Sequence, residues 1–437
     1  MDVVGQEELP VCSPPSSSGR LDGPVPEALG DLQPRPFHVV AAPAPARSVR
    51  AAWRAVEPPW RRAIVVGLGA TAVFRLITIA VAMERAYSAS APSVLLRHPG
   101  QFLTPWRQWD TKWFDAIASV GYARSSAAVD AHFDGTAFAP AYPLGMRAVA
   151  LVLHISPLLA GLLISTAALA VALVGLHRLA DLDGGPVVAG AAVAAALLAP
   201  GSAFFAVPYS ESLSLATVVW ALLAARRGRW WLAGAAAALA VLSKYYLAIL
   251  VVALIVEYLH QQDWSARRIH RDIVGLAIPP ALALGAWTVY MGRRFGQPLR
   301  FLHAEGTWKH HLAPPWTMVQ VALQDITKRH YLSGGNTAGL VYTFDGVALL
   351  GLVAITVYAA RRLRPAYTVL LGLGVLTLST TGLPVSINRY MIPLAPIYLA
   401  LGLLLGRHRN AERAFVAVSV PISLYLLDHF VTGRWAG

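Results

Sequence analysis

Long runs of apolar residues, separated by short polar turns, recur along most of the chain. After residue 58 we distinguish about eleven such runs, several of them as long as the roughly 20 residues that a helix needs to cross a bilayer. They cover residues 64–83, 155–176, 187–207, 211–225, 230–243, 246–260, 273–291, 338–360, 366–382, 390–406 and 414–431. The pattern predicts an all-α polytopic membrane protein with about 11 transmembrane helices, of which the shorter ones tilt, extend into loops or form half-helices.

The N-terminal stretch, residues 1–58, contains no apolar run of this length. It is rich in proline, serine, glycine and alanine, a composition that buries little apolar surface and is typical of disordered segments. The first apolar run also begins too late in the chain for a cleaved signal peptide. We therefore expect a disordered tail over residues 1–58 and a membrane domain over residues 59–437.

The composition of the whole chain agrees with a membrane protein. Of the 437 residues, 56% are hydrophobic and 14% are charged, and the mean hydropathy is +0.53, above the range of soluble globular proteins. The formal net charge of +13 comes mostly from arginines that follow apolar runs, as orientation signals do. This placement identifies the lipid bilayer as a partner and argues against nucleic acid. The one cysteine, Cys12, excludes a disulfide within the chain.

The arginine clusters also predict the topology, because basic residues concentrate in cytoplasmic turns and each span reverses the side. If the arginines within residues 47–62 lie inside, the later clusters fall inside only when residues 137–153 do not cross the membrane. The later clusters are at residues 226–229, 267–268, 361–364 and 407–409. Because residues 137–153 contain two prolines and an arginine, we expect a helix that lies in the outer leaflet there.

This topology places the long loops on the exterior side. It predicts a first exterior loop with amphipathic helices at about residues 85–154 and a second exterior segment at about residues 292–336. The N-terminal tail and the arginine-rich turns are then cytoplasmic parts of a multi-pass protein of the cell membrane. Sites are usually built on loops that a rigid scaffold positions, so we expect the active site to face the exterior.

One segment of the first exterior loop, residues 107–122, has helical periodicity and carries an acid in an unusual position. At about 100° per residue, an apolar stripe forms along one side. The stripe consists of Trp109, Trp113, Ile117 and Val120, with Phe114 at its edge. The opposite, solvated face consists of Thr111, Asp115 and Ser119. Asp110 lies inside the apolar arc, and an acid among aromatic residues beside a bilayer is a candidate functional residue.

Two interpretations of Asp110 are open at this point. Its position before Thr111 is that of a helix N-cap. Alternatively, partial desolvation makes it a general base that takes a proton from an attacking hydroxyl. Glu211, in the turn at residues 208–212, presents a similar choice. It either caps the following helix together with Ser210, or it holds an acceptor hydroxyl or acts as a catalytic partner.

Cations on the predicted exterior side complete the candidate site. Lys244 lies between two short apolar runs, where it either binds a partner such as a lipid-linked phosphate or extends to the interface. A cation at this position would stabilise a departing phosphate. The other candidates from this side include Lys112, His303, Arg389 and Tyr390. His310 and His311 are adjacent and point in different directions, which argues against a two-histidine metal site.

Two motifs of metal and nucleotide chemistry are missing from the sequence. It contains no His-Glu-x-x-His run and no Walker loop, and no α/β nucleotide-binding region is visible. We therefore expect no metal and no cofactor. An exterior enzyme without a nucleotide-binding fold must take an activated donor from the membrane itself.

Five short motifs occur in a fixed order between residues 60 and 410. They are Trp109-Asp110-x-x-Trp-Phe-x-x-Ile117-Ala118-x-x-Gly121-Tyr122, Ala137-Phe-x-Pro140-x-Tyr142-Pro143, Pro208-Tyr-Ser-Glu211-Ser, Arg227-Gly-Arg-Trp-Trp-Leu-Ala-Gly234 and Phe295-Gly-x-Pro298-Leu-x-Phe301-Leu. As an ordered set they resemble the PIG-V-like mannosyltransferases, which belong to the GT-C class of membrane glycosyltransferases. The tail before residue 58 is not covered by this resemblance.

The resemblance implies a GT-C-like bundle with an acidic catalytic residue in the first exterior loop. It also implies a polyprenyl- or dolichyl-phosphate mannose donor and inversion at the anomeric carbon without a required metal. By motif, Asp110 is the catalytic base, and Glu211 occupies the second acidic turn as a further catalytic residue. The substrate-binding residues that we expect are Trp109, Lys112, Trp113, Tyr142, Tyr209, Lys244, Tyr245, His303, Arg389 and Tyr390.

The sequence thus predicts a membrane-embedded inverting mannosyltransferase that uses a polyprenyl-phosphate-mannose donor. The acceptor is a lipid-linked or protein-linked glycan on the exterior side of the membrane. A polytopic lipid or sugar transporter or flippase is the alternative, since helices and intramembrane charge fit it as well. A transporter should show a midplane cavity between related halves, whereas an enzyme should show an outward-facing pocket lined by Asp110.

Overall fold

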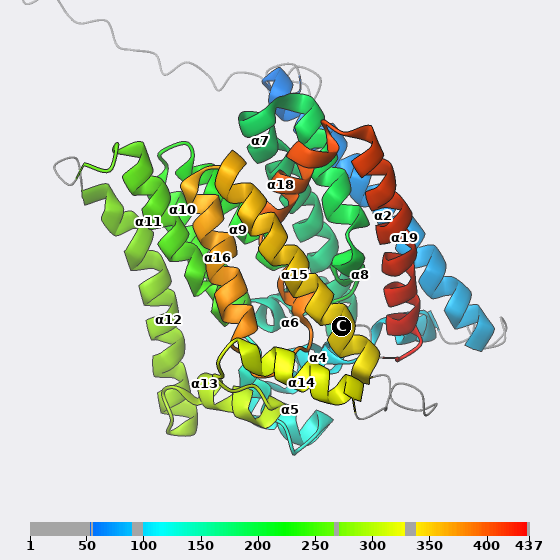
Figure 1. Ribbon diagram of the computed structural model, residues 1–437. Helices are drawn as coiled ribbons and strands as arrows, with labels where there is room; N and C mark the ends of the chain where they lie inside the picture. Colours follow the sequence, from blue (N-terminus) through cyan, green and yellow to red (C-terminus); the bar gives the residue numbers. More distant parts are fainter. Residues whose placement is uncertain (1–52, 54–55, 90–98, 266–270, 328–337, 435–437) are drawn as a thin grey trace, which may run out of the picture. The chain divides into compact units, whose positions relative to one another are not determined.

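The computed structural model describes residues 53, 56–89, 99–265, 271–327 and 338–434. The described residues form helices joined by turns, and they contain no strand (Figure 1). The predicted all-α class is confirmed for this part of the chain. Most of the predicted tail, the arginine pair at 267–268 and the end of the second exterior segment lie outside the described residues.

Five of the described helices are long and apolar enough to cross a bilayer. They are α2 (Pro58–Ala89), α7 (Pro157–Leu198), α12 (Val274–Phe295), α15 (Ala338–Arg362) and α19 (Arg409–Val431). The 42 residues of α7 correspond to about 63 Å of straight helix, twice the thickness of the hydrocarbon core. The helix breaks at Gly185, whose φ of 79° is left-handed, so the predicted spans 155–176 and 187–207 begin on either side of this break.

The other predicted spans correspond to shorter apolar helices. They are α9 (Glu211–Ala225), α10 (Trp230–Ser243), α11 (Ile249–Gln261), α16 (Pro365–Ser379) and α18 (Pro396–Leu405). Each has 10 to 15 residues, fewer than the roughly 20 of a straight span. The short apolar piece at Pro200–Ala206, which contains α8 (Ala203–Ala206), is bent by 102° against α9 and could form a sixth span with it. The count of about eleven spans stays a prediction.

Small residues allow the central helices to pack closely. A Cβ atom on Gly234 of α10 would lie 1.9 Å from the carbonyl oxygen of Gly275 on α12. A Cβ atom on Gly402 of α18 would lie 2.8 Å from the carbonyl oxygen of Val188 on α7. Lipid tails are as apolar as leucine, so close backbone approach of this kind is a main source of attraction between helices in a membrane. These glycines therefore set the spacing of the bundle.

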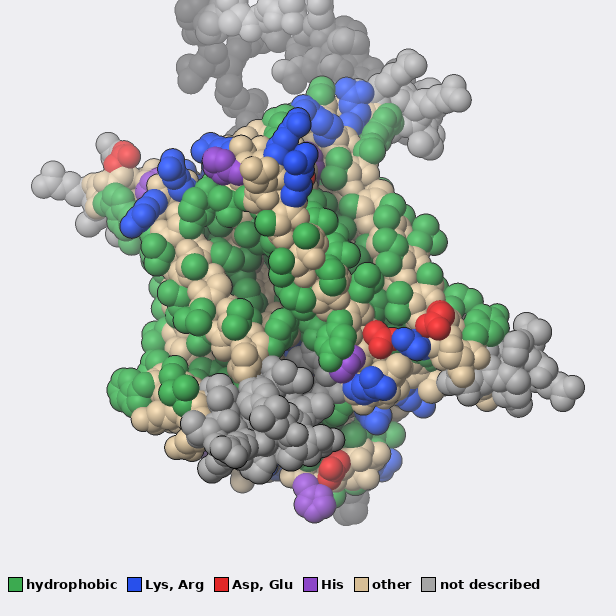
Figure 2. Space-filling view, turned by 45° about the vertical axis from the view of Figure 1, so that its right-hand side comes forward, with side chains coloured by type: hydrophobic (Ala, Val, Ile, Leu, Met, Phe, Trp, Pro, Cys, Tyr) green, Lys and Arg blue, Asp and Glu red, His purple; other side chains and the backbone are tan. Residues whose placement is uncertain are grey.

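The helices of the two predicted exterior loops gather at one end of the bundle, the lower end in Figure 1. They are α4 (Asp110–Val120), α5 (Tyr122–Val129), α13 (Arg300–Ala304) and α14 (Trp316–Thr327), while α6 (Ala141–Leu153) packs between α4 and α7. Figure 2 shows a group of lysine and arginine side chains at the opposite end, beyond a belt of hydrophobic side chains, and others at the lower end together with acidic side chains. We call these ends the loop end and the arginine end. Which of them faces the exterior stays a prediction from the positive-inside rule.

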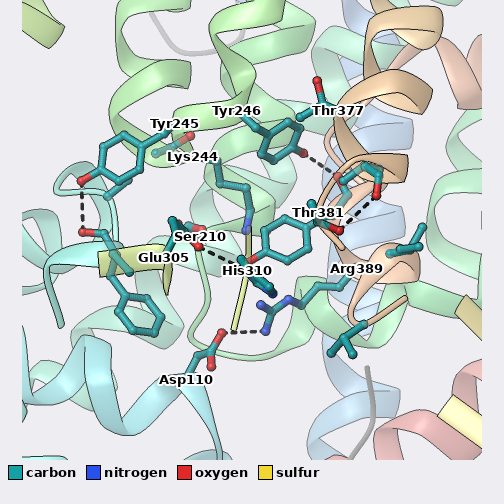
Figure 3. Close-up of a pocket in the computed structure, with 18 of the residues that line it drawn as sticks. Asp110, Ser210, Lys244, Tyr245, Tyr246, Glu305, His310, Thr377, Thr381 and Arg389 are labelled. Carbon is teal, nitrogen blue, oxygen red and sulfur yellow. Dashed lines mark hydrogen bonds and ion pairs between the residues drawn. The ribbon is translucent and has the colours of Figure 1, made fainter. Parts of the chain in front are cut away.

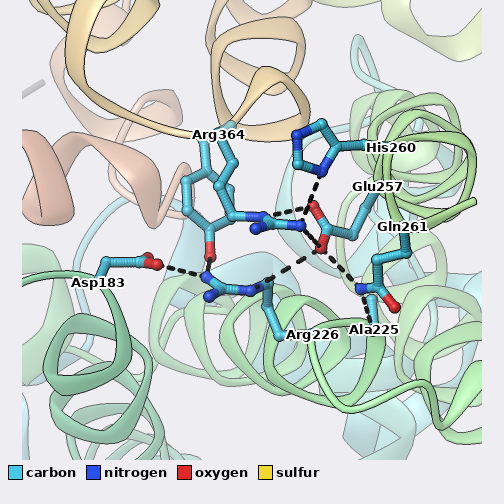
Figure 4. A network of polar contacts seen from close by, with 8 residues as sticks. Asp183, Ala225, Arg226, Glu257, His260, Gln261 and Arg364 are labelled. Atoms are coloured by element: carbon cyan, nitrogen blue, oxygen red, sulfur yellow. Dashed lines mark hydrogen bonds and ion pairs between the residues drawn. The ribbon is translucent and has the colours of Figure 1, made fainter. Parts of the chain in front are cut away.

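Buried ion pairs join four helices at the arginine end (Figure 4). Glu257 of α11 is 1% exposed and accepts hydrogen bonds from Nε and Nη2 of Arg364, at 3.0 and 2.8 Å. Arg226, at the C-terminus of α9, donates to Asp183 at 2.5 Å and to the hydroxyl of Tyr367 at 2.9 Å. These contacts connect α7, α9, α11 and α16, and they satisfy charges that would otherwise be costly to bury.

We expect Glu257→Gln to lower the free energy of unfolding by about 3 kcal/mol, because it leaves Arg364 and Arg226 without their shared carboxylate. The midpoint of thermal unfolding in detergent measures this change. Glu412→Gln is the matched control, because Glu412 lies exposed in the first turn of α19 and should leave the midpoint unchanged. Equal midpoints for the two variants would contradict a stabilising role of the network.

Candidate active site

Asp110 is the first residue of α4, and its side chain turns toward the centre of the molecule. Its carboxylate Oδ2 accepts a hydrogen bond from Nη1 of Arg389 at 2.7 Å, and its backbone N–H donates to the hydroxyl of Tyr209 at 3.0 Å. The N-cap position of α4 belongs to Trp109, and no side chain caps the helix there. The interpretation of Asp110 as an N-cap is therefore wrong. The carboxylate pairs with a residue 279 positions away in the sequence and does not cap its own helix.

The buried face of α4 differs from the predicted stripe. It consists of Thr111, Trp113, Phe114, Ile117 and Ala118. Trp109 and Val120 are 38% and 44% exposed, although both were placed on the apolar stripe. Asp115 is not solvated as expected: its side chain is 16% exposed and pairs with Arg107 at 2.9 Å. Burial raises the pKa of the Asp115 carboxyl, and the guanidinium of Arg107 opposes this shift.

Glu211 is the first residue of α9, directly after the sharp bend that follows α8. Its side chain is 1% exposed, and Oε1 accepts a hydrogen bond from Nζ of Lys244 at 3.1 Å. The same oxygen lies 3.4 Å from Nε of Arg389. Ser210 occupies the N-cap position but makes no capping hydrogen bond, so the predicted cap by Ser210 is wrong. An acid in the first turn still meets the positive end of the helix dipole.

Lys244 and Arg389 lie at breaks between helices. Lys244 has extended backbone (φ −154°) between α10 and the short helix η4 (Tyr245–Ala248), and its side chain is 10% exposed, so it does not extend to the interface. Arg389 belongs to the four-residue helix α17 (Ile387–Tyr390), and its side chain is 7% exposed. Both cations lie against the ring of Tyr390, with Nζ of Lys244 at 4.6 Å and the Arg389 guanidinium carbon at 5.0 Å from its centroid.

Together these residues form a chain of alternating charges, in the order Asp110, Arg389, Glu211 and Lys244. Figure 3 shows Asp110, Arg389 and Lys244 of this chain. We call this chain the charge quartet. The two acids balance the two cations, which makes their shared burial tolerable. The sequence predicts each member separately, and the structure brings all four together.

The charge quartet has unused hydrogen-bonding capacity. Oε2 of Glu211 and Nε of Arg389 are buried and have no hydrogen-bond partner among the described residues. The great majority of buried polar atoms in folded proteins do have a partner. Open positions of this kind next to a cavity can bind polar groups of a ligand.

A cavity of about 510 Å³, which we call the first cavity, opens beside the quartet. All four quartet residues line it, together with Tyr209, Tyr245 and Tyr390 from the predicted set. Its lining also includes the apolar side chains of Leu302, Leu312, Leu378, Val385 and Ile387. The lining of the cavity therefore combines charged and apolar side chains, as a ligand with a polar head and a hydrocarbon chain would require.

A second cavity of about 540 Å³ adjoins the first at Asp110 and Arg389. Of the predicted substrate-binding residues, Trp109, Lys112 and Trp113 line this second cavity and not the first. Asp110 therefore lies at the junction of two cavities that differ in their lining.

Two of the predicted substrate-binding residues do not reach either cavity. Tyr142 is fully buried in the core, where its hydroxyl lies 2.8 Å from the carbonyl oxygen of Gly161 and 2.7 Å from Oγ of Ser165. Its ring packs edge-on against Phe114, so it positions α4 on α6. His303 lies exposed on α13 and lines neither cavity. The structure therefore places neither residue at these two cavities.

The structure adds lining residues that lie outside the predicted substrate-binding set. Tyr246 lines the first cavity, and its hydroxyl donates to the carbonyl oxygen of Tyr390 at 2.5 Å. His310 and Glu305 line both cavities, and Nδ1 of the histidine lies 3.0 Å from Oε2 of the glutamate. Their spacing of five residues carries no regular pattern, so only the tertiary structure identifies the pair. Within the described ranges, no three His, Cys, Asp or Glu side chains are arranged to hold a metal ion.

No protein-family model matches the chain, and no curated protein matches its sequence. Among solved structures, it matches the oligosaccharyltransferase of Archaeoglobus fulgidus. The apo form is 13% identical, with 84% of this chain and 56% of that chain covered and a TM-score of 0.37. The same archaeal protein in complex with an inhibitory peptide and a dolichol-phosphate is 14% identical, with the same coverage and a TM-score of 0.37. The chain spans about half the length of that protein.

Proposed function

We propose that the protein is a membrane-embedded inverting mannosyltransferase that uses a polyprenyl-phosphate-mannose donor. The acceptor is a lipid-linked or protein-linked glycan at the loop end. The observation that carries this proposal is the position of Asp110, whose carboxylate lies at the junction of two cavities and is held there by Arg389. The ordered motifs that resemble PIG-V-like mannosyltransferases supply the sugar and the donor class.

The first cavity suits a lipid-linked phosphate. Lys244 and Arg389 supply two cations on one wall, and charge-assisted hydrogen bonds to phosphate are among the strongest in proteins. The apolar lining residues, Leu302, Leu312 and Leu378 among them, suit the first isoprene units of a polyprenyl chain. An amphiphilic donor of this kind diffuses to the site within the bilayer, so the protein needs no nucleotide-binding domain.

In the proposed reaction, an acceptor hydroxyl oxygen forms a bond to C1 of the sugar while the bond from C1 to the phosphate oxygen breaks. The electron pair of that bond stays on the polyprenyl phosphate, and Lys244 and Arg389 stabilise the charge that develops there. The hydroxyl proton passes to the Asp110 carboxylate. Because Arg389 occupies Oδ2, it orients the carboxylate and leaves Oδ1 to take the proton.

The position of both cavities favours this enzyme over a transporter. Each is lined by residues of α4 at the loop end, as expected for an enzyme with Asp110 in its pocket. A transporter would place its site near the bilayer midplane between related halves.

The donor site is tested by the binding of polyprenyl phosphate to the full chain in lipid nanodiscs. We expect Lys244→Gln to weaken this binding by about 10- to 100-fold, because one charge-assisted contact to the phosphate is lost. Lys309→Gln is the matched control, since Lys309 is exposed and lines neither cavity. Unchanged affinity of the Lys244 variant, or tighter binding of a nucleotide sugar than of polyprenyl phosphate, would overturn the proposal.

A further inference from the structure

The second cavity has a different chemistry from the first. The two cavities share several lining residues, among them Asp110, Arg389 and Tyr390, but most of the residues that line only the second cavity are aromatic or polar, and none is a leucine. The aromatic residues that line only the second cavity are Trp109, Trp113, Phe133 and Trp308. A volume of about 540 Å³ is within the usual range of small-molecule sites.

The aromatic wall of the second cavity is fixed by its own packing. The ring of Trp308 contacts the rings of Trp113 and Phe133, with centroids 5.3 and 4.6 Å away. Its indole N–H donates to the carbonyl oxygen of Asp134 at 3.3 Å. Aromatic side chains held in this way offer a rigid apolar surface at a small cost in side-chain entropy.

Trp109 at this cavity is held in an unfavourable backbone conformation. Its φ of 49° lies in the left-handed region, which bulky residues rarely adopt, and the residue is 38% exposed. The indole N–H donates to the carbonyl oxygen of Arg434 at 2.9 Å, so the exposed ring has a fixed orientation. Strained, exposed and fixed residues beside a catalytic group are characteristic of ligand sites.

Polar groups accompany the aromatic wall. Asp130 lines the cavity and accepts hydrogen bonds from the backbone N–H of His132 at 3.0 Å and from its ring at 2.9 Å. These bonds lower the pKa of the Asp130 carboxyl, which therefore stays an acceptor for hydroxyl groups. Lys112 and Gln108 add donors on the same lining. A ligand with apolar ring faces and hydroxyl edges matches this combination.

We infer that the second cavity is the acceptor subsite, and that it binds a carbohydrate whose ring lies on the indole of Trp109. This inference rests on the proposed function, which places the phosphate of the donor in the first cavity. An acceptor in the second cavity reaches Asp110 from the side away from Lys244, because Lys244 lines only the first cavity. Attack from the side opposite the leaving phosphate is the geometry that inversion requires.

The test uses the full chain in nanodiscs, with α-linked mannobiose as the acceptor probe and polyprenyl phosphate as the donor probe. We expect Trp109→Ala to weaken mannobiose binding by about tenfold, because the stacking surface is lost, and to leave polyprenyl phosphate binding unchanged. Trp316→Ala is the matched control, because Trp316 is 63% exposed and lines neither cavity. Saturation-transfer NMR on the sugar protons measures the affinity.

The outcomes separate this inference from the proposed function. If mannobiose binds wild type and Trp109→Ala equally, or binds neither while polyprenyl phosphate binds normally, the acceptor subsite is overturned and the donor site stands. If a serine-containing peptide binds in a Trp109-dependent manner and mannobiose does not, the acceptor class is wrong. If mannobiose binding depends on Trp109 but polyprenyl phosphate does not bind, the carbohydrate site is supported and the proposed donor is contradicted.

Discussion

Asp110→Asn is expected to lower the turnover number of sugar transfer by about 10²- to 10⁴-fold, the usual contribution of a positioned general base. The amide keeps the size of the side chain and can still accept a hydrogen bond from Arg389, but it takes up no proton. Donor binding should stay within a few-fold of wild type, because Lys244 and Arg389 are unchanged. Initial rates at saturating donor, together with the affinity for polyprenyl phosphate, measure both effects.

Asp115→Asn is the matched control for this variant. Asp115 lies on the same helix and also pairs with an arginine, at 2.9 Å, but it lines neither cavity. We expect transfer by this variant to stay near the wild-type rate. If both variants keep their activity while folded, Asp110 is not the base, and if both lose it, the helix rather than the carboxylate is responsible.

Arg389→Ala is expected to abolish transfer and also to lower the free energy of unfolding by about 3–5 kcal/mol. Arg389 is the contact between the two acids of the charge quartet, so its removal leaves Asp110 without its partner and Glu211 with Lys244 alone. Arg293→Ala, which removes an exposed arginine near the end of α12, should change neither quantity. Thermal unfolding in detergent and transfer rates measure the two effects.

A double-mutant cycle tests whether the ion pair causes this loss of stability. In the Asp110→Asn background, Arg389→Ala should lower the free energy of unfolding by less than in wild type. The reason is that Asp110 no longer carries a charge that the loss of Arg389 would leave unpaired. The expected coupling is about 1–3 kcal/mol, a range measured for residues in contact. Strictly additive effects of the two substitutions would contradict the ion pair seen in the structure.

Most of the helices could be predicted from apolar length alone, but their breaks could not. The run at residues 187–207 is mostly apolar, yet its helix ends at Leu198 and a short bent piece follows. Pro200 and Pro208 flank that piece and lack the N–H groups that a continuous helix needs. Hydropathy does not distinguish a straight span from a broken one, because the helix that ends at Leu198 and the short piece after it are both apolar.

The members of the charge quartet could be predicted because acids and cations in apolar surroundings are rare and costly. Their convergence could not, since the partners of Asp110 and Glu211 lie on distant segments. The differences between the predicted and observed positions of Asp115 and Tyr142 also come from tertiary packing, which the sequence does not show. Helical periodicity indicates one buried face of α4, but Arg107 folds back and covers Asp115 on the other. A motif tyrosine such as Tyr142 packs in the core as readily as it lines a site.

The most direct test of the proposed transfer follows a radiolabelled mannose in membranes that contain the full chain. Polyprenyl-phosphate-mannose is supplied as donor, and the label is followed into the glycan fraction for wild type and for Asp110→Asn. We predict that wild type moves the label into glycan with release of an equal amount of polyprenyl phosphate, and that the Asp110 variant leaves it on the lipid. Transfer at the same rate by both proteins, or transfer only when a nucleotide sugar replaces the lipid donor, would contradict the proposed function.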